Sequence, residues 1–538
     1  MPARYRRQVS TTLYRRGRVR SAADPFATAL LVDGDTVAWV GSEGAADTMS
    51  ADETIDLDDA WLAPAFVDAH VHMTSTGLAL TGLDLTGSPS LAAALQAVER
   101  ASRAVHGGVL LGTGWDDSAW PEQRPPTAAE LDRASYGGVV YLARADVHSA
   151  VASSALLAAC PQARGRPGFL ADGLVRTEAH HAVRAAAYAA ITRSQRRAAQ
   201  RVALDRAASL GIACVHECGG PDSGGEQDLL DLLALDHGVE RVAYWGELDG
   251  IERARALGAV GAGGDLFADG ALGSHTACLS TAYADETTSG HAYLDAEQVG
   301  RHVAACTRAG LQAGFHAIGD AALQAVADGF DLAATQVGDL RAARHRVEHV
   351  ELVTAAQVAV LAAHGVVASV QPAFDARWGG PTGMYATRLG RQRAAGMNPF
   401  AAMAAAGVAL ALGSDSPVTP LDPWGTLRAA AQHRTPGSGL SARAAFAAHT
   451  RGGWRAARRD GEGELVPGAP ATFALWQVDG ELVVQTPDER VAGWSTDPRA
   501  GVAGLPDLAG PDPVCLATVV GGRQVSGGHI RGGDGHPR

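Results

Sequence analysis

Apolar segments of strand length alternate with alanine-rich stretches through the middle of the chain. Short apolar runs of this kind are typical of buried strands in a parallel sheet, and the alanine-rich stretches are typical of the helices between them. Eight strands are expected, at residues 65–72, 211–217, 241–246, 264–269, 311–316, 345–349, 366–371 and 408–415. Because a closed (β/α)8 barrel needs eight parallel strands, the pattern predicts an α/β fold with a TIM-like barrel.

Both ends of the chain carry a different pattern, in which apolar and polar residues alternate over short segments. Turns containing Asp-Gly separate neighbouring segments, as is typical of β-hairpins. The segments are residues 29–32, 36–40, 471–478, 481–485 and 514–520. Neither end is long enough for a core of its own, so we expect residues 1–63 and 460–538 to form one small β domain beside a barrel of residues 64–459.

One connection is too long for an ordinary barrel. Between the first two predicted strands, residues 80–200 far exceed a normal connection between a strand and a helix. We therefore expect these residues to form an inserted subdomain after the first barrel strand, over the mouth of the barrel.

The composition narrows the class of ligand. The chain of 538 residues is 46% hydrophobic and 19% charged, and its formal net charge of −13 disfavours binding to nucleic acids or anionic membranes. We expect a small-molecule substrate and leave a homodimer open. The start of the chain lacks an apolar signal region and no later stretch is apolar enough to span a bilayer, so we expect a cytoplasmic protein with reduced cysteines.

The predicted barrel strands end in residues that bind metal ions. The first ends in His70 and His72, the fifth in His316, the sixth in His349, and the eighth runs into Asp415. Active sites of such barrels lie at the carboxyl ends of the strands, and residues two apart on a strand face the same side. A His-x-His pair alone is a weak signal in a chain with 19 histidines, but its position together with the other strand ends indicates a metal site.

This set of side chains suits a hydrolytic metal ion. Neutral imidazoles and a carboxylate such as Asp415 are preferred ligands of Zn²⁺, and an open ligand position leaves room for water. The pKa of a water bound to zinc falls toward about 7, which makes hydroxide available at neutral pH. Asp415 would lie close enough to handle a proton.

In these segments the chain resembles the amidohydrolase superfamily, and in particular the amidohydrolase-3 or YtcJ-like branch that includes N-substituted formamide deformylases. The segments are LAPAFVDAHVHM (62–73), LFADGALGSHTA (266–277), GFHAIGDAA (314–322), HRVEHVEL (345–352), LGSDSPV (412–418), GTGWDDSAW (112–120) and YLARADVHSAVASSAL (141–156). The resemblance implies a β-sandwich built from the two termini, and metal ligands at His70, His72, His316, His349 and Asp415. It also implies that Asp415 is the general base and later protonates the leaving amine. His349 would instead contact the hydroxide or the oxyanion if one ion binds.

The chain departs from the family at one position. Family members often carry a carboxylated lysine that bridges two ions, and this chain contains no lysine, so that its 45 basic residues are all arginines. Asp265 stands where the lysine is expected, and it would bridge two ions imperfectly, ligate one ion, or only balance charge. We expect one tightly held Zn²⁺, with room for a weaker second divalent ion.

Further candidates lie in the insertion and at other strand ends. Aromatic walls with a polar group are typical of small-molecule sites, and residues that alternate on one strand face can contact a substrate together. The candidates for substrate contact are Trp115, Asp116, Asp146, His148 and Gln371, with Trp120 and Arg377 as weaker ones. His216 and Glu217 end the second strand without an assigned role, Asp320 is expected to cap the following helix, and His275 is expected to be a loop residue.

We expect hydrolysis of a carbon–nitrogen bond other than a peptide bond, in a linear amide or an N-substituted formamide, by metal-activated hydroxide. A cyclic-amide hydrolase or a deaminase would use the same ligands, and the missing lysine leaves open a metal-binding relative without activity. A carbohydrate-active barrel with paired carboxylates is disfavoured, because histidines dominate the strand ends.

Overall fold

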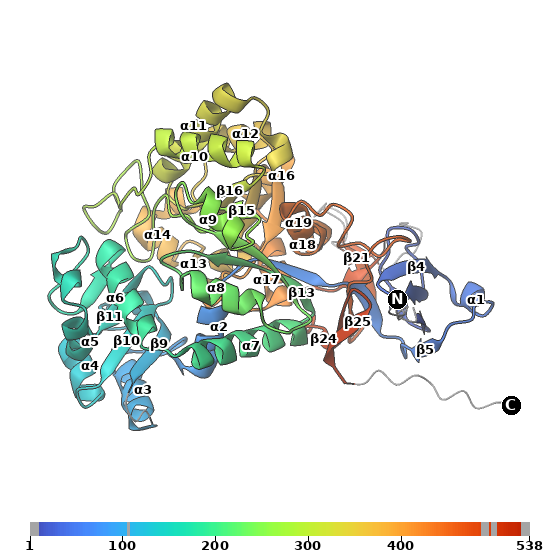
Figure 1. The fold of residues 1–538 in the computed structure, drawn as a ribbon, viewed down its shortest axis with the longest axis horizontal. Coiled ribbons are helices and arrows are strands. Elements are labelled where there is room, and N and C mark those ends of the chain that lie inside the picture. Colours follow the sequence, from blue (N-terminus) through green and yellow to red (C-terminus); the bar gives the residue numbers. More distant parts are fainter. Residues whose placement is uncertain (1–9, 105–107, 486–493, 496–502, 529–538) are drawn as a thin grey trace, which may run out of the picture.

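The computed structural model describes residues 10–104, 108–485, 494–495 and 503–528. Its centre is a sheet of eight parallel strands in the order β19-β18-β17-β16-β15-β14-β13-β7 (Figure 1). The strands are β7 (Phe66–Val71), β13 (Ile212–Gly219), β14 (Glu240–Trp245), β15 (Gly261–Ala262), β16 (Gln312–Ala317), β17 (Arg346–His349), β18 (Val367–Val370) and β19 (Ala409–Leu412). The predicted α/β barrel is confirmed.

Hydrogen bonds beyond the end of β19 bring the two ends of this sheet together. The backbone N–H of Asp415 donates to the carbonyl of His70 at 2.8 Å, and the N–H of His72 donates to the carbonyl of Ser416 at 3.0 Å. The Asp68 carboxylate accepts from the N–H of Ser414 at 3.0 Å. The ring of strands is therefore nearly closed, and its first and last strands meet at the carboxyl end.

Helices surround the barrel, and their sequences carry clear start and stop signals. In α10, Asp295 and Gln298 form a capping box at the start, and Gly310 ends the helix with a left-handed φ of +72°. The helices outside the insert are α2 (Met73–Thr81), α7 (Arg193–Ser209), α8 (Glu226–Leu233), α9 (Ile251–Ala256), α10 (Ala296–Ala309), α11 (Asp320–Val337), α12 (Ala355–Ala363), α13 (Pro372–Trp378), α14 (Met384–Leu389), α15 (Arg391–Ala394), α16 (Phe400–Ala405), α17 (Pro423–Ala431), α18 (Ala442–His449), α19 (Arg451–Ala456) and the short α1 (Glu43–Ala46).

The fourth barrel strand is shorter and earlier than predicted. The expected strand at residues 264–269 is wrong: β15 ends at Ala262, and φ is +147° at Gly263 and +83° at Gly264. These values break a strand, and a Cβ on Gly263 would lie 2.1 Å from the backbone nitrogen of Gly314. The strand is interrupted here, and the chain returns to β16 at Phe267, where the N–H of Ala268 donates to the carbonyl of His316 at 2.9 Å. Asp265 therefore lies in the bend before this bridge, at the mouth of the barrel.

Strands from both termini pair beside the barrel. Two sheets, in the orders β4-β3-β1-β5 and β2-β6-β20-β24-β25, enclose a shared apolar core. Their strands are β1 (Thr11–Arg15), β2 (Arg18–Val19), β3 (Ala29–Asp33), β4 (Thr36–Gly41), β5 (Glu53–Asp56), β6 (Trp61–Pro64), β20 (Phe473–Gln477), β24 (Val514–Val520) and β25 (Arg523–Gly527). β3 and β4 form the expected hairpin.

The stretch after β20 does not fold back on it. β20 pairs with β6 on one side and β24 on the other, so β21 (Leu482–Gln485) pairs instead with β22 (Trp494–Ser495) and β23 (Leu505–Pro506). Because both edges of β20 are occupied, the Asp-Gly turn that follows it does not produce a hairpin.

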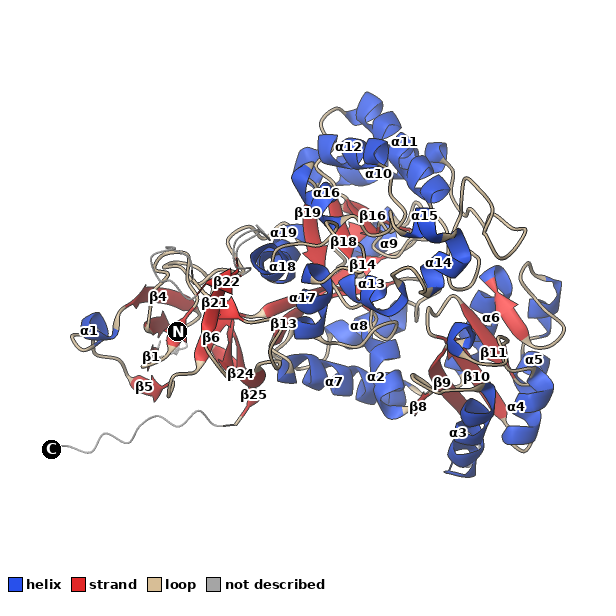
Figure 2. Cartoon of the chain, turned by 180° about the vertical axis from the view of Figure 1, so that it is seen from behind, coloured by secondary structure: helices blue, strands red, loops and turns tan. Residues whose placement is uncertain are grey.

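The connection after β7 contains a separate sheet in the order β12-β11-β10-β9-β8, which we call the insert. Its elements are β8 (Leu83–Asp84), α3 (Leu91–Ala104), β9 (Val109–Trp115), α4 (Ala128–Ala134), β10 (Val139–Arg144), β11 (Ser149–Ala152), α5 (Ser154–Ala159), β12 (Leu174–Arg176) and α6 (Thr177–Ala189). The insert and the β domain lie on opposite sides of the barrel (Figures 1 and 2). Among the described residues, no helix has the length and apolar character needed to cross a bilayer.

Two histidines in the core link the stability of the fold to pH. Nδ1 of His345 accepts from the N–H of Ala313 at 2.8 Å, and Nδ1 of His449 lies 2.9 Å from the carbonyl of Val67. Burial lowers the pKa of His345 to about 3 and that of His449 to about 4. The unfolded chain therefore binds more protons than the folded chain below about pH 6.5.

We predict that the free energy of unfolding falls as the pH drops from 7 to 5. Each buried neutral histidine contributes up to about 1.4 kcal/mol per pH unit to this slope, because its stabilising effect is complete above its unfolded pKa and is lost below it. Denaturant titrations at several pH values measure the slope. His345→Gln should reduce it by about one proton, whereas His291→Gln, at a partly exposed loop position, should leave it unchanged. An equal slope in His345→Gln and wild type would contradict the assignment.

Candidate metal centre

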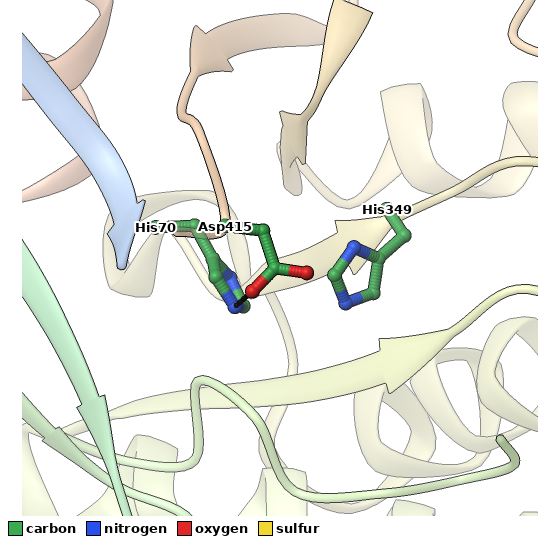
Figure 3. Close-up of side chains that lie close together, drawn as sticks. All are labelled: His70, His349 and Asp415. Atoms are coloured by element: carbon green, nitrogen blue, oxygen red, sulfur yellow. Dashed lines mark ion pairs between the residues drawn. The ribbon is translucent and has the colours of Figure 1, made fainter. Parts of the chain in front are cut away.

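The first barrel strand brings two imidazoles to the mouth of the barrel. β7 ends at Val71, and His70 and His72 face the same side. Asp415 follows the last strand, and its Oδ1 lies 3.4 Å from Nε2 of His70 and 3.3 Å from Nε2 of His72. Figure 3 shows the His70 ring meeting the Asp415 carboxylate, with the ring of His349 on the other side of that carboxylate. Side chains that are far apart in the sequence thus meet at one place at the mouth of the barrel.

These separations are those expected between ligands of a single cation. In a tetrahedral zinc site with bonds of about 2.0–2.2 Å, neighbouring ligand atoms are about 3.3–3.6 Å apart. Asp265 lies at a similar distance, with Oδ2 3.4 Å from Nε2 of His72 and Oδ1 4.0 Å from Nε2 of His70. His70, His72 and Asp265 form one group able to hold a metal ion, and His70, His349 and Asp415 form another.

Hydrogen bonds behind the centre determine which imidazole nitrogen faces it. Nδ1 of His70 lies 2.7 Å from Oε2 of Glu348, and it must donate because a carboxylate only accepts. Nδ1 of His349 lies 2.7 Å from Oε1 of Gln371. In both rings Nε2 keeps its lone pair for the centre, and among the described residues Nε2 of His70 is buried without a hydrogen-bond partner. Such orientation by a second hydrogen bond is typical of metal-ligating histidines.

A buried arginine holds Glu348 in place. Nε of Arg346 donates to Oε1 of Glu348 at 2.5 Å and Nη2 donates to Oε2 at 2.9 Å, while the guanidinium lies 4.3 Å from the centroid of the Tyr244 ring. Burial raises the pKa of Glu348, but Arg346 and His70 outweigh burial and bring the pKa to about 2. No role was predicted for this pair from the sequence. The signal in the sequence was the spacing of two residues, which places Arg346 and Glu348 on the same face of a strand.

Unusual backbone geometry turns two side chains toward the centre. Arg346 and Glu348 face the lumen along β17, so a regular strand would direct His349 away from it. Instead, φ is +71° at His349, +51° at Val350 and +52° at Asp415. Residues other than glycine rarely adopt this left-handed region, and such strain is concentrated at functional sites.

Asp265 lies between two groups of ligands. Its Oδ2 faces His72, while its Oδ1 lies 3.2 Å from Nδ1 of His316 and 3.7 Å from Nε2 of His349. Nε2 of His316 lies 3.1 Å from the carbonyl of Gly270 and therefore carries the hydrogen, which leaves Nδ1 free. Asp265, His316 and His349 form a further group able to hold a metal ion. The carboxylate of Asp265 therefore belongs to two of the groups of side chains that could hold a metal ion.

The charges of the centre favour a divalent cation. Burial raises the pKa of Asp265 and of Asp415, but the surrounding imidazoles outweigh burial and hold both pKa values well below the usual range. Burial lowers the pKa of His70, yet Cys218 and Asp415 more than reverse this effect. A metal ion would therefore displace a proton from the centre, and its affinity should rise with pH.

A cavity of about 250 Å³ opens onto the centre. Side chains of both the barrel and the insert line it, including His72, Asp265, His316, His349, Asp415, Tyr141, His148, His180, His181 and Arg184. A larger cavity of about 610 Å³ lies between the β domain and α18 and contains none of the candidate metal ligands. The smaller cavity is therefore the candidate substrate site.

Two of the predicted substrate contacts lie beside the centre. His148 comes from the insert, and its ring centroid lies 4.9 Å from that of His316. Burial, and then His316, lower the pKa of His148 to about 3, so its imidazole is neutral. Asp146 lines a small side chamber with His148, but its carboxylate is occupied by Nη1 of Arg144 at 2.8 Å and Oγ of Ser274 at 2.9 Å. Only His148 of this pair offers free donor and acceptor atoms to a ligand, among the contacts described.

Other predicted contacts have different surroundings. Trp115 and Trp120 are buried in the core of the insert, where their indole N–H groups donate to the carbonyls of Leu142 and Ser88. Neither lines the cavity, so their interpretation as a substrate wall is corrected to a packing role. Asp116 accepts from Arg144 at 2.8 Å and from the indole of Trp378 at 3.3 Å. It joins the insert to the barrel rather than facing the cavity.

Gln371 also acts behind the centre. Its Oε1 accepts from Nδ1 of His349, and Gln371 is not among the residues that line the cavity, so the predicted substrate contact is corrected to a contact that orients the His349 ring. Asp320 is the first residue of α11 and accepts from Ser280, so it is not the cap of that helix.

The weaker candidates lie outside the cavity. Burial raises the pKa of Glu217 to about 7, and this side chain accepts from the N–H of Met73 at 2.8 Å. His216 lies 3.2 Å from Arg346, and Arg377 donates to the carbonyl of Val418. His275 is a loop residue paired with Asp285 and Glu286.

Helix α6 contributes a wall of the cavity that was not predicted from the sequence. His180, His181 and Arg184 all line it, with Tyr141 from β10. Adjacent histidines followed by an arginine one turn later were the only signal, and such spacing on a helix does not show which partner the helix faces.

The chain is similar to several known proteins. Residues 53–526 match the sequence model of the Amidohydrolase family. The chain is 27% identical over 557 residues to Protein LONG AFTER FAR-RED 3 of Arabidopsis thaliana, covering 93% of this chain and 88% of that protein. It is 27% identical over 405 residues to Putative amidohydrolase YtcJ of Bacillus subtilis, covering 69% and 73% of the two chains.

A shorter match and a solved structure extend the comparison. The chain is 32% identical over 145 residues to N-substituted formamide deformylase of Arthrobacter pascens, covering 26% and 27% of the two chains. The crystal structure of an uncharacterized metal-dependent hydrolase from Pyrococcus horikoshii aligns with a TM-score of 0.70 at 25% identity, covering 88% of this chain and 98% of that one.

We predict that Glu348→Gln weakens zinc binding by about 10- to 100-fold, because the charged acceptor that orients His70 is lost. Competition with a chromophoric chelator measures the affinity, and thermal unfolding is recorded in parallel because Arg346 loses its counter-charge. Glu240→Gln, at the opposite end of the barrel strands, is the matched control. Equal zinc affinity in folded Glu348→Gln and in the control would contradict the role of Glu348.

Proposed function

The chain belongs to the Amidohydrolase family, as its motifs predicted, and on this premise we propose that it is a zinc-dependent hydrolase of carbon–nitrogen bonds other than peptide bonds. The substrate that we propose is a linear amide or an N-substituted formamide. One observation carries the proposal: Oδ1 of Asp415 lies 3.4 Å from Nε2 of His70 and 3.3 Å from Nε2 of His72, and Oδ2 of Asp265 lies 3.4 Å from Nε2 of His72, next to a cavity of about 250 Å³. These are separations expected between neighbouring ligand atoms of one zinc ion.

The donor set supports zinc. Imidazole nitrogens with carboxylate oxygens suit this ion, and Nε2 of His70 is a buried acceptor without a partner among the described residues. A zinc ion at this position would supply an activated water near neutral pH and would polarise the substrate carbonyl.

Asp415 is placed to move the proton. Its carboxylate is ionised, because the surrounding imidazoles hold its pKa low despite burial, and the ionised form is the one that can accept a proton from the attacking water. The departing nitrogen needs a proton when the C–N bond breaks, and Asp415 holds one at that stage. Water is thus divided between the two products, an acid and an amine.

His148 and His349 have separate roles in this proposal. Nδ1 of His349 carries the hydrogen and donates it to Oε1 of Gln371. Nε2 of His349 therefore has a lone pair and no hydrogen to donate. It is suited to a metal ion and not to stabilising an oxyanion. His148 is neutral, faces the cavity and carries one N–H, so it can donate to the carbonyl oxygen as negative charge develops there.

We predict that chelation abolishes hydrolysis of N-substituted formamides or linear amides and that added zinc restores it. Asp415→Asn and His70→Ala should each lower kcat/KM by about a thousandfold or more, since both remove a ligand or the base. Asp320→Asn, outside the cavity lining, is the control. A panel that adds cyclic imides and aminated rings separates amidase from cyclic amidase and deaminase. Activity that survives chelation would refute the scheme, and a protein that binds zinc but hydrolyses nothing would favour the inactive relative.

Asp265 has its own prediction. Wild type should hold one zinc tightly and a second at higher zinc concentration, because the carboxylate faces both ligand groups. Asp265→Ala should lose the second ion, and Asp265→Asn, which keeps the size, should weaken it. Metal content by mass spectrometry over a zinc titration is the measurement. Two ions at saturation in Asp265→Ala would show that this residue does not join the two positions.

A further inference from the structure

The insert supplies a fixed wall to the cavity. His180, His181 and Arg184 lie within about one turn of α6 and all line the cavity. Oη of Tyr141 lies 2.8 Å from Nε2 of His180, and the ring of His181 stacks on Phe267 with centroids 5.7 Å apart. The position of this wall is therefore set by contacts on both sides of the helix.

Of the three side chains in this wall, only that of Arg184 is charged at neutral pH. Burial, and then Arg184, lower the pKa of His180 well below its usual value and that of His181 to about 4. Both imidazoles are therefore neutral at neutral pH, and the wall presents one guanidinium beside neutral aromatic surfaces. A permanent positive charge of this kind is most stable next to an anion.

The partners of Arg184 leave most of its donors unused. One N–H donates to the backbone carbonyl of Asp222, and Nε is enclosed without an acceptor. In the part of the chain that the structure describes, no ion pair joins Arg184 to a carboxylate, whereas Nε of the neighbouring Arg196 lies 3.8 Å from Oδ1 of Asp228. A guanidinium has five N–H donors, so Arg184 can still bind a second, charged group.

We propose that Arg184 binds a carboxylate of the substrate, so that the substrate is an amide with a negatively charged group away from the scissile bond. This inference rests on the proposed hydrolase function. A ligand that fills the cavity displaces water from the guanidinium, and a neutral ligand would leave its N–H donors without acceptors. Carboxylate oxygens replace that water with charge-assisted hydrogen bonds.

The same charges orient the substrate. Asp265 and Asp415 line the cavity at the candidate metal centre and repel an anion, while Arg184 attracts it. Asp222 and Arg196 line the cavity as well. The neutral amide is thereby directed to the metal centre and the carboxylate to α6. A specificity residue placed on the insert lets the barrel keep the same chemistry for different substrates.

The test uses the zinc-loaded enzyme and a series of N-formyl ω-amino acids of increasing chain length, each paired with its uncharged ω-carboxamide. Wild type should prefer the acid by about tenfold or more in kcat/KM at the best chain length, and Arg184→Gln should remove that preference while the carboxamide changes less than about threefold. Arg133→Gln, on the exposed face of α4, is the control that should keep it. Arg196→Gln removes a second arginine of the cavity lining, whose charge lies near Asp228, and should also keep the preference. Equal preference in Arg184→Gln and wild type would overturn the proposal.

A binding measurement separates this inference from the proposed activity. Calorimetry compares linear dicarboxylates with monocarboxylates of equal length on zinc-loaded wild type and Arg184→Gln. Loss of about tenfold or more in affinity for the dicarboxylates alone would support Arg184, because any contact with zinc is common to both series. If no amide is hydrolysed, the hydrolase function fails, and this comparison still decides the role of Arg184. Equal affinities in the two proteins would refute it.

Discussion

Asp265 and Asp415 place two negative charges in a buried space at the mouth of the barrel, and the arrangement of the site follows from their need for a positive partner. An isolated buried carboxylate is strongly destabilising. Arg346, which is buried behind His70, is already paired with Glu348, the group that orients His70. Only protons on the imidazoles or a bound cation remain to balance the two acids. A divalent ion does so while leaving the imidazoles neutral, which is why the site is best understood as a metal site.

Holding these groups together requires backbone conformations that an isolated peptide would avoid. Gly263 and Gly264 break the fourth strand and release Asp265 into the mouth, and His349 and Asp415 adopt left-handed φ values that reverse their direction. For residues other than glycine, such as His349 and Asp415, this conformation costs of order 1–3 kcal/mol each, and the cost is sustained only when the surrounding structure leaves no alternative. A nearly closed barrel with its strands hydrogen-bonded on both sides provides that restraint. The fold thus holds the strained residues His349 and Asp415 in fixed positions.

The sequence predicted those features that depend on local pattern or on the ends of strands. The alternation of apolar and alanine-rich segments was enough for the barrel, and the position of His70 was enough to assign it to the mouth. Prediction from the sequence failed where a pair of glycines interrupts a strand, as at Gly263. It also failed where the partner of a side chain lies far away in the chain: Trp115 turned out to pack within the insert, and Gln371 to hold His349. The contribution of α6 to the cavity was not predicted, because the sequence of a helix does not show which part of the protein the helix packs against.

The division between barrel and insert has a mechanical consequence. The proposed metal ligands and the proposed base come from the barrel, whereas His148 and Arg184 come from the insert. The distance between the barrel and the insert therefore sets the distance between the candidate metal centre and these two side chains. Arg144, 2% exposed, fixes that distance: it binds Asp116 and Asp146, which in turn accept from Trp378 and Ser274 on the barrel side. Displacements of about 1 Å in a catalytic site can reduce rates about a hundredfold. Breaking this buried network of Arg144, Asp116 and Asp146 would leave several charges unpaired at once. The network is therefore suited to hold α6 over the candidate metal centre.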